Sequence, residues 1–225
     1  MPVPQLNFSQ AIQAVWHKDA LCEYRTRYAA GALLMFALTT LSSVSMAIAG
    51  TSLPPDLAAA LLWIVLFFCA MAGLARVFVQ EQEAGTLLGL RLYAPPQAVF
   101  FGKLLFNLVL LASLACLVVP LFVIFLAIEV EQWLAFGVIL VLGCTGIAVV
   151  STLTAAMVMY AEGKHAIFTV LTFPVLLPQF LSAISGTARI LAGGMPDYAE
   201  LLFMAGYDAA MIAAGVLLFD YLWQT

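Results

Sequence analysis

Charged residues are scarce in this chain of 225 residues: they make up 9% of it, whereas 65% is hydrophobic. The mean hydropathy is +1.10. A soluble domain of this size could not hide so much apolar surface, because a large share of any globular surface faces water. The scarcity of charge therefore predicts a protein that lies in a bilayer. The apolar runs are long and do not alternate as in a membrane β-barrel, so an all-α integral membrane protein is expected.

Several motifs are also absent. The sequence has no Gly-x-x-x-x-Gly-Lys-Ser/Thr loop for binding ATP, so we expect no enzyme activity in this chain. It has no basic run that would indicate a nucleic-acid partner. The four cysteines lack Cys-x-x-Cys spacing, so we expect no metal site and interpret them as small apolar packing residues. Residues 1–25 show no signal-peptide pattern.

Long apolar runs dominate what is present. About 20 apolar residues cross a bilayer core of roughly 30 Å. We predict one transmembrane domain over residues 1–225 with six transmembrane helices, at 28–49, 57–79, 99–127, 133–160, 166–185 and 199–223. An irregular stretch is expected over 186–198. Before the first span, apolar residues recur at helical spacing within 7–27, which predicts an amphipathic helix lying in the membrane interface.

The basic residues predict the orientation of these spans. If the N-terminus is cytoplasmic, seven of the eight basic residues lie on the cytoplasmic side, and only Arg189 lies outside. The acidic residues Asp56, Glu129 and Glu131 then also lie outside. We therefore predict a multi-pass membrane protein with both termini in the cytoplasm.

The segment 76–103 is the longest predicted cytoplasmic stretch. Gly85 is expected to end or bend the second span, Thr86 to cap a short helix over 87–92, and Pro95 with Pro96 to stop it. Such a helix suits docking to a soluble ATPase. The spacing of its leucines is equally consistent with an interfacial helix whose leucines insert into lipid. The residues assigned to ATPase coupling are Glu81, Glu83, Gly85, Thr86, Leu87, Leu88, Gly89, Leu90 and Arg91.

Polar and helix-breaking residues within the spans supply further candidates. Pro174 and Pro178 each remove a backbone hydrogen bond, so they are candidates for a pathway or hinge, with a static kink as the alternative. Asn107 is polar within a span and is expected to face protein. His17 and His165 are the only histidines and are interpreted as surface residues. We identify no catalytic residue.

The order of motifs along the chain resembles a known family. The matching residues are Arg76-x-Phe78, Glu81-x-Glu83, Gly85-Thr86-Leu87, Gly89-Leu90, Pro95, Gly102-Lys103 and Asn107, with Lys18-Asp19 before them and Thr172 to Pro178, Asp208 and Phe219 to Tyr221 after them. Together they resemble the haem exporter protein B (CcmB) family, the permease subunit of the cytochrome c maturation system within the ABC transporter superfamily. The resemblance extends over nearly the whole chain.

The resemblance implies a function and a set of partners. It implies haem export or handling for cytochrome c biogenesis, driven by a separate cytoplasmic ATPase, the A subunit, which forms a dimer and binds ATP. It implies other membrane subunits of the same maturation complex and leaves open a second permease copy. No cofactor is expected in this chain, and haem is the expected cargo. Two alternatives stay open: a permease for lipid, polysaccharide or drug export, and a membrane scaffold that does not transport but drives release of a haem-loaded partner.

Overall fold

A computed structural model describes residues 7–26, 28–48, 53–74, 81, 85–86, 89–90, 94–159 and 164–224. Within these residues the long elements are all α-helices and no strand occurs. The helices are α1 (Phe8–Thr26), α2 (Tyr28–Ile48), α3 (Pro55–Leu74), α6 (Pro96–Leu126), α7 (Trp133–Val158), α8 (Lys164–Leu191) and α9 (Tyr198–Gln224). The all-helical class expected from the apolar runs is confirmed in the described residues.

Five helices in the described part of the chain are long and apolar enough to cross a membrane. They occupy Pro55–Leu74, Pro96–Leu126, Trp133–Val158, Ala166–Leu191 and Tyr198–Tyr221. The first predicted span corresponds to α2, in which the stretch Leu33–Ile48 is a shorter apolar helix. The chain is therefore a multi-pass helical membrane protein, and the sixth crossing stays a prediction.

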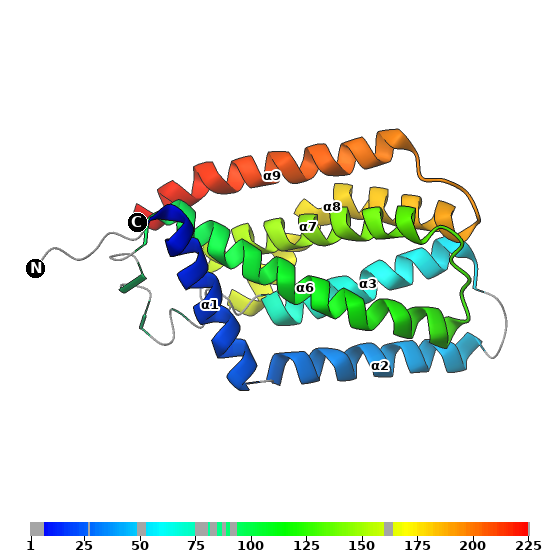
Figure 1. The fold of residues 1–225 in the computed structure, drawn as a ribbon. Coiled ribbons are helices and arrows are strands. Elements are labelled where there is room, and N and C mark those ends of the chain that lie inside the picture. The colour runs from blue at the N-terminus through cyan, green and yellow to red at the C-terminus, as the bar shows by residue number, and fades with distance from the viewer. Residues whose placement is uncertain are drawn as a thin grey trace, which may run out of the picture.

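Helix α7 lies at the centre of the bundle. It contacts α3, α6, α8 and α9, while α2 packs along α3 and α6 at the edge. Figure 1 shows these six helices running roughly side by side, with the start of α1 and the end of α9 at the same end of the bundle. Helix α1 crosses that end at a steep angle to the others (Figure 1).

The core packs closely around one tryptophan. Trp63 of α3 is buried, and its Nε1 donates a hydrogen bond to Thr187 Oγ1 of α8 at 3.0 Å. A Cβ added to Gly143 of α7 would lie 2.1 Å from the Trp63 ring, so only glycine fits there. Three spans therefore meet at this point with no space left between them.

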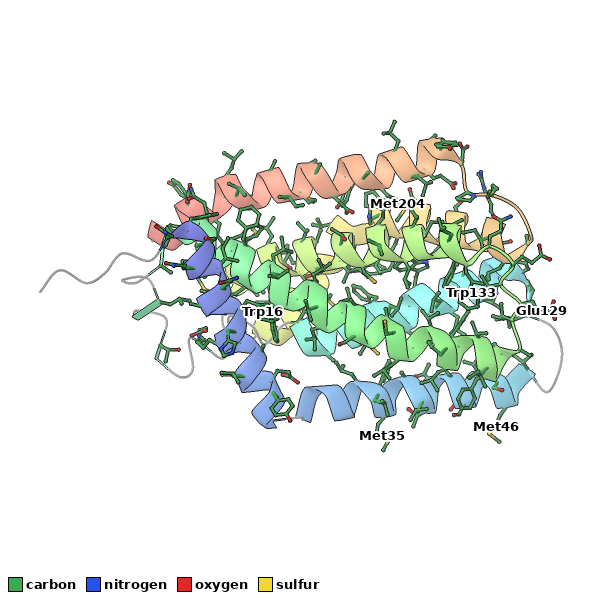
Figure 2. All side chains as sticks on the ribbon, viewed as in Figure 1. Trp16, Met35, Met46, Glu129, Trp133 and Met204 are labelled. Atoms are coloured by element: carbon green, nitrogen blue, oxygen red, sulfur yellow. The ribbon has the colours of Figure 1, made fainter. Side chains whose placement is uncertain are left out.

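The outer surface of the bundle is apolar. Met35 and Met46 of α2 are 64% and 83% exposed, and Figure 2 shows both pointing away from the other helices. Leu202 of α9 and Ile124 of α6 are similarly exposed. Apolar side chains exposed along several long helices are expected where lipid, rather than water, covers the surface.

The end of α8 corrects one sequence prediction. The expected span ended at residue 185 because Gly186 was interpreted as the start of an irregular stretch, but α8 continues to Leu191. A Cβ on Gly186 would lie 2.6 Å from Ile139 Cδ1, so this glycine serves close contact with α7 rather than helix termination. The helix ends instead at Gly193, whose φ is +81°, where the Gly194 N–H donates to the Arg189 carbonyl at 2.8 Å.

Candidate functional site

A fully buried lysine lies at the end of the bundle that α1 crosses. Lys103 is in the second turn of α6, and its side chain has no exposed surface. Its Nζ lies 3.2 Å from Asp19 Oδ2 of α1 and 3.3 Å from Glu81 Oε1. A buried cation is tolerated only when opposite charges compensate it. Here one carboxylate comes from the N-terminal helix and the other from the segment that follows α3.

Lys18 completes this group of charges. It contacts Glu81 Oε1 and lies 3.8 Å from Asp19 Oδ1, with 41% of its side chain exposed. Burial and the neighbouring Lys103 charge lower the pKa of Lys18, and the Asp19 carboxylate opposes this shift. The four residues Lys18, Asp19, Glu81 and Lys103, hereafter the charge cluster, carry two positive and two negative charges. The cluster is therefore neutral overall and joins three separate parts of the chain.

Close contact between α1 and α6 holds the cluster together. Ala11 and Val15 of α1 are buried, and a Cβ added to Gly102 of α6 would lie 2.8 Å from the Val15 side chain. The rings of Phe8 and Phe101 meet edge to face, with their centroids 6.5 Å apart. Figure 2 shows Trp16 on α1 at the same end of the bundle. Gly102 thus lets α1 approach closely enough for Asp19 to reach Lys103.

Glu81 also fixes the turn that follows it. Gly85 has a φ of +67°, and the Thr86 N–H donates to the Glu81 carbonyl at 3.1 Å. This is the bond between residues five positions apart that closes a helix end in a Schellman motif. The Thr86 hydroxyl donates to Glu81 Oε2 at 2.6 Å. Glu81 therefore links the turn at Gly85 to both lysines of the charge cluster.

The turn leads into helical backbone. The Leu90 N–H donates to the Thr86 carbonyl at 3.0 Å, and Gly89 and Leu90 are both helical. Leu90 packs partly against the core, whereas Gly85, Thr86 and Gly89 are exposed. The other residues assigned to coupling lie outside the described residues: Glu83, Leu87, Leu88 and Arg91. The role of this segment in coupling stays a prediction.

The candidates within the spans do not take part in the charge cluster, although Asn107 follows Lys103 by one turn of α6. Asn107 is fully buried, and its Nδ2 donates to Thr152 Oγ1 of α7 at 2.8 Å, as expected for a polar residue that faces protein. Pro174 and Pro178 are exposed on the outer face of α8, which continues through both. Gln179 donates to the Leu142 carbonyl of α7 rather than to a carbonyl freed by these prolines. The pathway or hinge role of the two prolines stays a prediction.

The side chains that the structure describes include no group suited to hold a metal. Among the described residues, no three His, Cys, Asp or Glu side chains gather into a potential metal site. His17 is exposed on α1, and the side chain of His165 lies outside the described residues. The acidic residue Glu129 lies at the end of the bundle opposite α1, where Figure 2 also places Trp133.

The charge cluster was missed by sequence reasoning, although Lys103 gave a signal. It stands near the start of an apolar run of about 30 residues, and a lysine inside a span needs a partner. Its partners Asp19 and Glu81 lie 84 and 22 residues away along the chain. Nothing in the spacing of a single sequence joins such distant positions.

The fold and this cluster define a multi-pass α-helical membrane protein with an N-terminal helix docked across one end of its bundle. A sequence model of the family described as CcmB protein matches residues 10–219. The chain therefore belongs to the CcmB family, as the order of its motifs predicted. It is also similar to heme exporter protein B of Rhodobacter capsulatus, with 26% identity over 158 residues, which cover 70% of this chain and 72% of that relative.

Proposed function

We propose that this chain is the permease subunit of a haem exporter that serves cytochrome c biogenesis. Family membership and the similarity to a heme exporter protein B support the cargo. Haem is then a transported substrate rather than a resident cofactor. The chain would span the bacterial inner membrane six times, with α2 as the first crossing and both termini in the cytoplasm.

We further propose that a separate ATPase subunit, present as a dimer, drives this permease. The sequence lacks an ATP-binding P-loop, so ATP would be hydrolysed by the partner. The ATPase would dock on the segment from Glu81 to Arg91, at the end of the bundle where the charge cluster lies. Other membrane subunits of the cytochrome c maturation complex and a second permease copy would complete the assembly.

The charge cluster is the observation that carries the coupling proposal. Glu81 contacts lysines from α1 and α6, so a force applied to the segment after α3 reaches two other helices through these contacts. Thr86 and Gly85 fix the backbone beside Glu81. A push on this segment would therefore move α1 and α6 together rather than deform a loop.

A deletion strain tests the cargo. Loss of the chain should abolish haem-stained c-type cytochromes and leave b-type cytochromes intact. The wild-type chain and a double His17→Ala, His165→Ala variant should both restore the c-type cytochromes, with membrane levels checked for each. Normal cytochrome c formation in the clean deletion would contradict the haem assignment and favour the alternative, a permease for lipid, polysaccharide or drug export.

The coupling proposal needs its own measurement. The purified ATPase should bind the wild-type chain in detergent or nanodiscs and hydrolyse ATP faster in its presence. A Glu81→Gln variant, which keeps the size of the side chain and removes its charge, should retain binding but reduce the stimulation. Equal stimulation of ATP hydrolysis by the wild-type chain and the Glu81→Gln variant would show that the Glu81 charge has no role in coupling.

A further inference from the structure

A second polar group lies in the interior of the bundle, far from the charge cluster. Asp208 of α9 is 4% exposed and Gln179 of α8 is 2% exposed. The Gln179 Nε2 donates one hydrogen bond to Asp208 Oδ1 at 3.0 Å and another to the Leu142 carbonyl of α7 at 3.2 Å. Both hydrogens of the amide are therefore used, and three spans meet at this point.

Two oxygens of the Asp208–Gln179 pair have no hydrogen-bond partner in the described part of the chain. Asp208 Oδ2 and Gln179 Oε1 are buried and have no hydrogen-bond partner among the described residues. If Asp208 is ionised, both atoms can only accept hydrogen bonds, and each carries the cost of an unsatisfied buried acceptor. A single hydrogen on Oδ2 changes this, because it turns one acceptor into a donor for the other.

Among the described residues, no opposite charge pairs with Asp208. Helix α7 contains no Asp, Glu, Lys or Arg, and α8 carries its charged residues only at its two ends. Arg189, at one of these ends, pairs with Glu200 at 3.2 Å and Asp197 at 3.7 Å. On α6, Lys103 pairs with the carboxylates of the charge cluster.

The titratable groups of α9 on either side of Asp208 have other partners or are exposed, as Tyr198 and Tyr221 are. The Tyr207 hydroxyl donates to the Val175 carbonyl, and Asp220 accepts a hydrogen bond from Gln97 at 2.8 Å. An isolated carboxylate in such surroundings costs so much free energy that the group takes up a proton instead.

The backbone of α7 lies close against the pair. A Cβ added to Gly146 of α7 would lie 2.8 Å from Asp208 Oδ1 and 2.9 Å from Gln179 Nε2, so no side chain fits between α7 and these two atoms. The neighbouring cavity between Gln179 and Trp63 does not admit a water molecule. A proton on the acid needs no additional space at the pair.

We propose that Asp208 is a proton-binding site in the membrane interior, with the proton on Oδ2 donated to Gln179 Oε1. The acid and the amide then form a pair with two hydrogen bonds, which ties α9 to α8. In the neutral form the pair leaves no charge and no unsatisfied acceptor between the spans. Loss of the proton would leave a carboxylate beside Gln179 Oε1 and would remove one of the two hydrogen bonds between the acid and the amide, which weakens the contact of α9 with α8 at this point.

Infrared spectroscopy of the full chain in lipid nanodiscs tests the proton directly. At neutral pH the wild-type chain should show the C=O stretching band of a protonated carboxyl group, which should shift in deuterated water. The Asp208→Asn variant should lack this band. In Gln179→Leu the band should move to higher frequency, because the acid loses its hydrogen-bond acceptor. A wild-type spectrum identical to that of Asp208→Asn in this region would overturn the proposal.

Thermal unfolding distinguishes between a proton and a metal cation as the ligand of Asp208. Asn reproduces both hydrogen bonds of the neutral acid, so Asp208→Asn should unfold at the wild-type temperature and Asp208→Leu at a lower one. Replacing choline chloride by sodium chloride should leave the wild-type value unchanged. If Asn unfolds as early as Leu, and sodium raises the wild-type temperature, the site binds a cation and the proton assignment is wrong.

Discussion

Lys103 of α6 and Asp19 of α1 form an ion pair of 3.2 Å between residues 84 positions apart in the chain. The lysine is fully buried and the aspartate 10% exposed. The pair fixes the N-terminal helix on the end of the third predicted span. Because Glu81 lies within 3.3 Å of the same Nζ, the segment after α3 shares this anchor.

Removing one member of the pair should destabilise the protein strongly. Lys103→Met leaves the cluster with one excess negative charge, and Asp19→Asn leaves it with one excess positive charge. Breaking a buried pair on one side costs roughly 3–5 kcal/mol. The double variant restores neutrality, so its loss of unfolding free energy should be smaller than the sum of the two single losses. A double-mutant cycle by thermal or denaturant unfolding in detergent measures this coupling, and additive losses would contradict it.

Gly102 should tolerate no side chain. In Gly102→Ala the new Cβ would lie 2.8 Å from Val15 and 3.1 Å from the Ile12 carbonyl, so α1 must move away from α6. We expect a loss of about 1–3 kcal/mol, as for other overpacked sites. The matched control is Gly137→Ala on α7, where nothing lies within 4 Å of the added Cβ and the helix gains up to about 1 kcal/mol. Equal melting temperatures for the two variants would show that α1 is not held at Gly102.

Gly85 should matter for its backbone conformation alone. Nothing lies within 4 Å of a Cβ at Gly85 or at Gly89, but only Gly85 has a positive φ. Gly85→Val should therefore cost about 1–2 kcal/mol locally and change the direction of the segment, while Gly89→Val should not. ATPase stimulation should fall in Gly85→Val and persist in Gly89→Val, at unchanged melting temperatures. Full stimulation by Gly85→Val would remove the turn from the coupling mechanism.

The topology can be tested by cysteine labelling from either side of the membrane. With the four native cysteines replaced, single cysteines at Asp56, Glu129 and Gly193 should react with an impermeant reagent from the periplasm. A cysteine at Tyr24, which is 70% exposed on α1, should react only from the cytoplasm. Labelling at Asp56 on the same side as Tyr24 would show that α2 does not cross. Labelling of Asp56, Glu129 and Gly193 only from the cytoplasm would reverse the orientation.

The helices could be predicted from the sequence because an apolar run long enough to cross a bilayer consists of consecutive residues. Trp133 begins both the predicted span and α7, for example. The role of a glycine is harder to predict from the sequence. Gly186 predicts the end of a helix, whereas in the structure it allows close contact with Ile139 of another helix. The sequence did not predict the ion pairs of Lys103, because its contact with Asp19 depends on how α1 lies across α6. The pair of Gln179 and Asp208 could not be predicted for the same reason, since the two residues lie 29 positions apart on different helices.

The charge cluster also imposes an order of events during synthesis. Lys18 and Asp19 leave the ribosome long before Glu81 and Lys103, so α1 has no buried counter-charge while the first two predicted spans are being made. Until then its charged face has water or lipid headgroups as its only surroundings. The docking of α1 is therefore a late step of membrane assembly, completed only when α6 has been inserted. A nascent chain arrested before Lys103 holds its first helix at the membrane surface.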